Sequence, residues 1–216
     1  MATLARLFIL SVLGAPLDLL GFDRSVRGDG VPADWKVRPV RGQRAPDAEI
    51  IGDGGTGPVL RLSSVGRAAW FYRELSPPLS PPGHLRWSWR VIDMPTRADL
   101  REERVDDSPI RVYVVFGTPR RFFGGGERII FYSCGNAEPE GYAGASHVRS
   151  KLHVIRVDGV AERGAWQEHD VEPLADYRRI WHDDPPPVAA SGLMQDTNQT
   201  RERAVAEMRW LEWQVP

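Results

Sequence analysis

The sequence predicts an all-β protein, an antiparallel β-sandwich with one short helix near residues 172–181. The alternation of side chains in residues 84–91 and 109–116 is typical of strands with one buried face. The 216 residues include 18 prolines and 21 glycines, which fits many turns and few long helices. About ten short strand-like segments follow one another without the strand–helix–strand rhythm of a parallel sheet.

Successive side chains of a strand point to opposite faces of its sheet. The apolar faces of the two alternating segments carry Leu85, Trp87, Trp89, Val91, Ile110, Val112, Val114 and Phe116. Their opposite faces carry Arg86, Ser88, Arg90, Arg111, Tyr113 and Val115. We predict that the two strands lie side by side, so that their apolar faces enter the core and their arginines share one polar face.

Turn signals and alternation predict the remaining elements in order. Further strands are expected at 35–40, 49–51, 59–63, 69–75, 127–134, within 147–158, and at 165–171, 188–194 and 204–213. The proline-rich residues 76–83 are expected to be a loop, because proline lacks the backbone N–H that a sheet ladder needs. Residues 96–107 are highly charged and predict a helical turn or a loop, and 135–146 predict a loop. Leu174, Tyr177 and either Ile180 or Trp181 lie at helical spacing, which predicts the helix.

The first fifteen residues have the order of a secretory signal peptide, with one arginine, a short apolar run and small residues. The apolar run is too short to span a bilayer as a helix, and the alternative is a buried first strand or a docked helix. We therefore expect a periplasmic or secreted protein that is not transmembrane. No internal repeat or linker divides the remainder, so residues 16–216 are predicted to be a single β-sandwich domain.

Composition and motifs narrow the classes of function. A net charge of −1 gives no general attraction to nucleic acid, so no nucleic-acid partner is expected. The single cysteine, Cys134, excludes an intramolecular disulfide and a metal cage made only of cysteines. The glycines at 124–126 are not followed by the lysine of a phosphate-binding loop, and there is no Gly-x-Ser-x-Gly esterase motif.

Several motifs taken together resemble one bacterial family. They are Phe22-Asp23 with Pro32-x-x-Trp35, Leu60-x-Leu-x-Ser64, Leu85-x-Trp-Ser-Trp-Arg-Val91, Asp106-Asp-x-x-x-Arg-Val-Tyr-Val-Val-Phe116 and Leu193-Met-x-Asp-Thr-Asn198-x-Thr200. In these motifs the sequence is similar to the family called domain of unknown function 3047, over nearly all of the chain after the leader. The resemblance implies an exported protein with a galactose-binding-like jelly roll, and it implies no particular activity.

The predicted polar face is the first candidate for ligand binding. Arginine presents a planar fork that suits carboxylates and paired hydroxyl groups, and a tyrosine ring can stack on a sugar. The candidate ligand-binding residues are Arg86, Ser88, Arg90, Asp106, Asp107, Arg111 and Tyr113. The alternative is an ordinary solvated sheet face, or arginines held in a structural network of ion pairs with Glu74, Asp106 and Asp107.

Asp196 and Asn198 are the candidate metal ligands. Their oxygens, together with those of Asp106 and Asp107 from another loop, suit calcium, which takes six to eight oxygen ligands. A structural calcium is therefore a candidate cofactor. The alternative is that these groups cap turns and hold Arg111. No His-x-His or His-x-x-x-His pair supports a transition-metal site.

Three functions follow from these candidates. The first is an exported, non-catalytic sandwich that binds a carbohydrate or another polyhydroxylated or anionic component of the cell envelope. Its further stacking residues are Phe122, Phe123 and Tyr142. The second is a hydrolase or lyase acting on envelope glycans, with Asp106 or Asp107 as the base and Arg111 stabilising charge. The third is a structural or protein-interaction module, which an exposed apolar patch would indicate.

Overall fold

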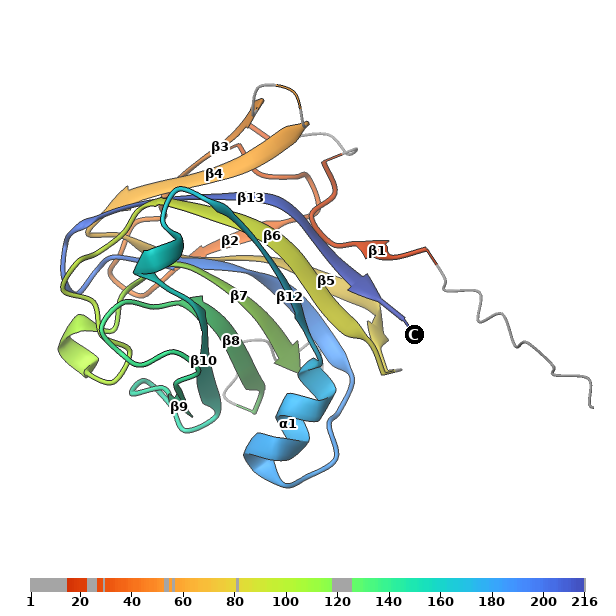
Figure 1. Cartoon of the computed structure of the whole chain (residues 1–216). Helices are drawn as coiled ribbons and strands as arrows, with labels where there is room; N and C mark the ends of the chain where they lie inside the picture. Colours follow the sequence, from red (N-terminus) through yellow and green to blue (C-terminus); the bar gives the residue numbers. More distant parts are fainter. Residues whose placement is uncertain are drawn as a thin grey trace, which may run out of the picture.

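The computed structural model describes residues 15–22, 27–28, 30–52, 55, 57–80, 82–117 and 126–215. In this part of the chain two β-sheets stack on each other, with one α-helix at an end, and confirm the predicted β-sandwich (Figure 1). The predicted signal peptide occupies residues 1–15, of which 1–14 lie outside the described residues. Phe122 and Phe123 lie outside them as well. No helix among the described residues is long and apolar enough to cross a membrane.

The first sheet has six strands in the order β11-β6-β13-β4-β3, with β1 beside β13. All of its pairs are antiparallel. Its strands are β1 Leu17–Asp18, β3 Asp47–Gly52, β4 Pro58–Val65, β6 His84–Asp93, β11 Trp166–Val171 and β13 Arg203–Gln214.

The second sheet has seven strands in the order β2-β5-β12-β7-β8-β10-β9. Its strands are β2 Lys36–Pro39, β5 Ala68–Leu79, β7 Ser108–Phe116, β8 Arg128–Cys134, β9 Ala143–Ala145, β10 Leu152–Asp158 and β12 Val188–Asp196. The pair of β8 and β10 is parallel, which departs from the predicted all-antiparallel arrangement. The segment between them returns to the starting end of β8 and places β9 on the far side of β10.

The predicted pairing of the two alternating segments is wrong. Residues 84–91 belong to β6 in the six-stranded sheet, and residues 109–116 belong to β7 in the seven-stranded sheet. Their apolar faces do meet, because both turn inward and contribute to the same core between the sheets. Alternation specifies which face of a strand is buried, and stacking across a sandwich satisfies it as well as pairing does.

Three smaller elements refine the prediction. β5 continues through the proline-rich segment to Leu79, which faces Val188, although a register shift interrupts the ladder after Glu74. Prolines are tolerated at such an irregularity because no ladder hydrogen bond is required there. The charged segment contains the 3-10 helix Glu103–Val105, and a second 3-10 helix spans Val160–Glu162. The predicted helix is α1, Pro173–Trp181, and it buries Leu174 and Tyr177.

A second apolar cluster covers the outer face of the seven-stranded sheet, on the side away from the first sheet. Tyr113, Phe131, Leu152 and Met194 are buried in it, and Trp70 packs against them half-buried. Both faces of this sheet are therefore apolar, and the outward face predicted to be polar is largely covered. A pocket lies over this cluster.

Candidate ligand-binding pocket

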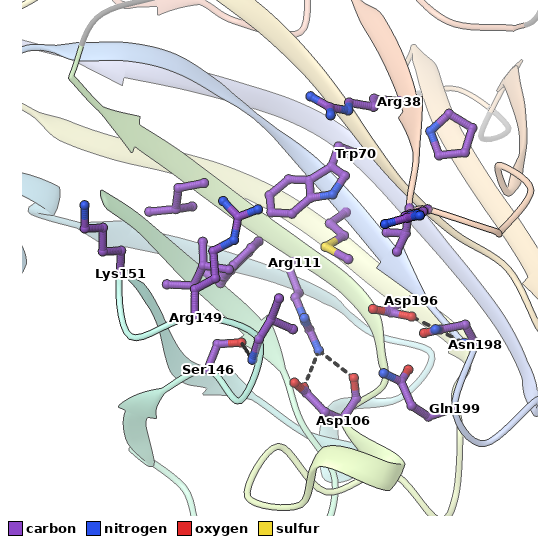
Figure 2. Close-up of a pocket in the computed structure, with 18 of the residues that line it drawn as sticks. Arg38, Trp70, Asp106, Arg111, Ser146, Arg149, Lys151, Asp196, Asn198 and Gln199 are labelled. Carbon is purple, nitrogen blue, oxygen red and sulfur yellow. Dashed lines mark hydrogen bonds and ion pairs between the residues drawn. The ribbon is translucent and has the colours of Figure 1, made fainter. Parts of the chain in front are cut away.

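A pocket of about 310 Å³ lies on the outer face of the seven-stranded sheet. Strands β2, β5, β12, β7 and β8 form its floor, and residues 146–152, which lead into β10, form part of its wall (Figure 2). A volume of this size is at the lower end of the range for small-ligand sites, which is about 300 to 1,000 Å³. The pocket therefore suits a small ligand or a short segment of a larger one.

The floor of the pocket is built by strand register. Arg38 of β2 faces Trp70 of β5, Trp70 faces Met194 of β12, and Met194 faces Arg111 of β7. Directly opposed residues on neighbouring strands project from the same face of a sheet, so these four side chains form one row across it. All four line the pocket.

The aromatic part of the floor is held from below. The Trp70 ring lies edge-on to Tyr113, with 5.1 Å between ring centroids, and 5.3 Å from the Phe131 ring. Tyr113 is fully buried, its hydroxyl donates to the backbone oxygen of Phe71, and burial raises its pKa well above the usual value. Tyr113 is thus a support for Trp70 and does not itself line the pocket.

Glycine at position 192 permits this arrangement. Gly192 lies in β12 between Tyr72 and Tyr113 of the flanking strands. A Cβ atom at this position would lie 2.0 Å from the backbone oxygen of Phe71. The strands β5 and β12 consequently approach each other at a distance that only glycine allows.

Arg111 and Asp106 form a buried ion pair at one end of the pocket. Arg111 is 4% exposed, and its Nη2 donates to Asp106 Oδ1 at 2.7 Å and to the backbone oxygen of Asp106 at 3.1 Å. Burial raises the pKa of Asp106, and the positive charge of Arg111 opposes this rise. The Nε of Arg111 has no hydrogen-bond partner among the described residues. This end of the pocket therefore keeps an unused donor beside a compensated charge pair.

Asp196 is the carboxyl group with the most perturbed acidity. Burial raises its pKa to about 7; the neighbouring Asp107 and Asp106 also raise it, and Arg111 and the backbone N–H of Asn198 lower it. That N–H donates to Asp196 Oδ1 at 3.3 Å. Near neutral pH the group is divided between its neutral and its charged form, so it can donate or accept a hydrogen bond.

Asp107 holds the turn that follows β12. Its carboxylate accepts hydrogen bonds from the backbone N–H of Thr200 at 2.7 Å, from the Thr200 hydroxyl at 2.6 Å and from the backbone N–H of Gln199 at 3.2 Å. The turn places Asn198 and Gln199 on the pocket wall (Figure 2). The buried Oδ1 of Asn198 and Oε1 of Gln199 have no partner in the described chain. Asp107 is thus a positioning residue, and the two amide oxygens are buried acceptors that no described residue satisfies.

Cationic side chains surround the opening. Arg41 follows β2, and Arg149 and Lys151 precede β10; all three are exposed and line the pocket. Figure 2 shows the Arg149 side chain extending from its loop toward the middle of the pocket. The guanidinium groups of Arg41 and Arg149 make no hydrogen bond or ion pair with any other residue that the structure describes. They are therefore available to an incoming anion.

The first three predicted site residues lie elsewhere. Arg86, Ser88 and Arg90 are on the outer face of the six-stranded sheet, so the predicted shared face with Arg111 and Tyr113 does not form. Arg86 pairs with Glu212 at 2.9 Å, and its guanidinium lies 5.7 Å from the Trp210 ring centroid.

A buried carboxylate organises this second polar face. Glu207 is completely buried and accepts from Arg61 Nε at 2.9 Å and from Arg90 Nε at 2.8 Å. The Arg90 guanidinium also lies 4.7 Å from the Trp166 ring centroid, and Ser88 is fully buried. The arginines of this sheet are thus held in ion pairs, but their partners are Glu207 and Glu212 and not the carboxylates that the alternative prediction named.

The metal prediction finds little support in the described part of the chain. No group of three or more histidine, cysteine, aspartate or glutamate side chains there is arranged to hold a metal ion. Arg111 already brings positive charge to Asp196, where calcium would need ionised oxygens. Calcium binding by Asp196 and Asn198 stays a prediction from the sequence.

Sequence reasoning missed Arg38, Trp70, Arg149 and Gln199 as members of a common site. They come from β2, from β5 and from two separate loops, and none belongs to a motif. The alternation of residues 69–75 predicts that Trp70 and Phe71 project from opposite faces of the sheet. The identity of its neighbours required the order of the strands.

Comparison with known proteins gives a family and several similar folds. A family model described as Protein of unknown function (DUF3047) matches residues 33–212, which confirms the resemblance seen in the motifs. A search of curated proteins finds no significant match.

Several solved structures have a similar fold. The family 11 carbohydrate-binding module of the Clostridium thermocellum cellulase Lic26A-Cel5E is 12% identical, with a TM-score of 0.49 over 92% of this chain and 94% of that one. A β-1,2-glucanase from Parabacteroides distasonis is 12% identical, with a TM-score of 0.49 over 94% of this chain and 26% of that one. The CBM22-1 xylan-binding domain of Paenibacillus barcinonensis Xyn10C is 9% identical, with a TM-score of 0.41 over 93% and 92%.

Proposed function

This chain belongs to the DUF3047 family of proteins of unknown function, and we propose that it is an exported, non-catalytic β-sandwich that binds a carbohydrate or another polyhydroxylated or anionic component of the cell envelope. The binding site is the pocket on the outer face of the seven-stranded sheet.

One observation carries this proposal: a partly accessible aromatic ring and two residues whose amide oxygens lack a partner among the described residues line the same pocket. Trp70 is half-buried over Tyr113 and Phe131, so its indole ring is held rigidly while part of it stays accessible. The amide oxygens of Asn198 and Gln199 accept from no residue in the described chain. A sugar ring offers an apolar face for stacking and hydroxyl donors for such acceptors.

The charge pairs in the pocket support a non-catalytic role. The enzyme hypothesis needs Asp106 or Asp107 as an open base, yet Asp106 is 5% exposed and paired with Arg111. Asp107 is 1% exposed and accepts three hydrogen bonds from the turn after β12. Neither carboxylate is free to take a proton from a substrate.

Asp196 supports a second candidate function, a glycan hydrolase. A carboxyl group with a pKa of about 7 matches a general acid at neutral pH. Glycoside hydrolysis also needs a second carboxylate across the cleft. Three acidic residues line the pocket, and since Asp106 is paired with Arg111, Glu127 is the candidate for this second carboxylate. Incubation with bound glycans, followed by assays for new reducing ends and for unsaturated products, distinguishes a binding protein from an enzyme. Product formation by the wild type that is lost in Asp196→Asn would establish the enzyme.

A pure interaction module is less well supported. The described chain exposes five large apolar side chains, those of Leu17, Val65, Ile92, Val148 and Val215. A few exposed apolar residues are normal on protein surfaces and do not by themselves indicate a partner.

Binding to a glycan array, followed by titration calorimetry with the best ligand, tests the proposal. Trp70→Ala should weaken binding about tenfold or more, because it removes the stacking surface. Trp210→Ala is the matched control, since Trp210 is also half-buried but lies on the six-stranded sheet. Equal affinities for wild type and Trp70→Ala would move the site away from this pocket.

Export is tested separately. The full chain, expressed in a Gram-negative host, should appear in the periplasmic or secreted fraction with its N-terminus shortened by processing near residue 15. Recovery of the unprocessed chain from the cytoplasm would contradict export and leave the binding proposal intact.

A further inference from the structure

We propose that the ligand of this pocket is an acidic sugar, whose carboxylate is bound by the guanidinium groups of Arg41 and Arg149. This inference rests on the proposed carbohydrate-binding function and specifies the chemical class of its ligand.

The charge of the pocket lining favours an anion. Arg111 and Asp106 compensate each other within their buried pair. Outside that pair, the lining contributes four cationic side chains, from Arg38, Arg41, Arg149 and Lys151. Only two carboxyl groups face them, those of Glu127 and Asp196. The lining thus has at least two more cationic groups than anionic groups, in a protein whose overall net charge is −1.

Arg41 and Arg149, the two arginines at the pocket opening, differ from the arginines on the six-stranded sheet. Arg61 and Arg90 share the buried Glu207, and Arg86 pairs with Glu212. Arg41 and Arg149 are exposed, come from two separate loops, and have no partner among the described residues. An ion pair with a ligand is therefore their first strong interaction, and no internal pair has to break for it.

The acidic groups of the lining favour a singly charged carboxylate over a phosphate. A guanidinium group binds either anion through two parallel hydrogen bonds. Glu127 and the partly ionised Asp196 would repel a dianion more strongly than a monoanion. A carboxylate on a pyranose ring also leaves the ring face free to stack on Trp70. A phosphate ester carries more charge and holds its water more strongly, which opposes its stacking on Trp70.

Matched pairs of oligosaccharides test the inference. Trigalacturonate and galactotriose differ only in the carboxylates. Two further pairs extend the comparison: glucuronic acid with glucose, and mannuronate oligomers with mannose oligomers. Galactose 6-phosphate represents a phosphate. Calorimetry should show that an acidic member binds at least about tenfold more tightly than its neutral partner. Arg41→Ala and Arg149→Ala should each remove most of that preference, and Arg149→Lys should retain part of it because a point charge remains.

Controls separate this inference from the proposed function. Arg203→Ala removes an exposed arginine from the six-stranded sheet and should leave affinity unchanged. Arg41 and Arg149 have no partners among the residues that the structure describes, so their variants should melt as the wild type does. Equal affinity for acidic and neutral members, with binding lost in Trp70→Ala, would overturn the acidic-sugar inference and keep carbohydrate binding. Tighter binding of the phosphate would overturn the carboxylate assignment. Binding of no member of any pair would overturn both proposals.

Discussion

Replacement of Asp196 by asparagine should stabilise the protein increasingly as the pH rises from 4 to 7 and leave its stability nearly unchanged in stronger acid. The carboxyl group has a pKa of about 7 in the folded protein against a usual value of 3.8. The folded state therefore binds a proton more tightly than the unfolded chain does. This contribution to stability is complete at pH values well below 3.8, where both states are protonated, and it is lost as the pH rises from 3.8 toward 7.

The magnitude follows from the size of the shift. Each pH unit between the two values costs about 1.4 kcal/mol, so the whole interval corresponds to about 4 kcal/mol in the free energy of unfolding. Asparagine keeps an oxygen for the backbone N–H of Asn198 and never ionises. The gain of Asp196→Asn over the wild type should thus grow from near zero at pH 4 to about 4 kcal/mol at pH 7 and then level off.

Urea unfolding of both proteins at each pH unit from 4 to 9 measures this difference. Arg111, Asp106 and Asp107, which surround Asp196, are present in both proteins, so their own contributions to stability largely cancel in the comparison. Parallel stability curves for the two proteins, or a wild type that gains on the variant as the pH rises, would refute the assignment of a buried, reluctantly ionised carboxyl group.

Three further substitutions test the packing around the site. Gly192→Ala should lower the free energy of unfolding by about 1–3 kcal/mol or more and weaken ligand binding, because the new Cβ would lie 2.0 Å from the backbone oxygen of Phe71; urea unfolding and calorimetry measure the two effects. Glu207→Gln should cost about 3–5 kcal/mol, since it leaves two arginines without their buried counter-charge, yet the folded fraction should bind ligand normally, as an affinity corrected for active protein would reveal. Asp107→Ala should cost about 1–3 kcal/mol by releasing the hydrogen bonds of Thr200, and it should also reduce affinity, whereas Thr200→Val should reproduce only part of either loss.

Local patterns predicted most of the fold. The alternation in β6 and β7 correctly identified their buried faces, and the helical spacing of Leu174 and Tyr177 identified α1. Proline positions misled at β5, which continues to Leu79 across a register shift. Such signals are reliable when they depend on one segment alone, because backbone geometry sets the period of a strand or a helix.

The candidate site depended on relations between segments. Arg111, Asp106 and Asp196 were singled out from the sequence and do line one pocket. Arg86 and Arg90 have the same residue type and the same alternation, yet they lie on the other sheet and bind Glu212 and Glu207. Nothing in either strand distinguishes an arginine that faces a ligand from one that faces an internal carboxylate.

The sequence by itself determined that this chain forms amphipathic strands with a tryptophan- and valine-rich core, and which family it belongs to. Only the tertiary structure decided that β12 separates β5 from β7, and so brought Trp70, Met194 and Arg111 into one row beneath a cationic rim. The physical reason is that alternation is satisfied by any partner that covers the apolar face. Strand order is chosen by the packing of the whole core, including the close approach that Gly192 alone permits.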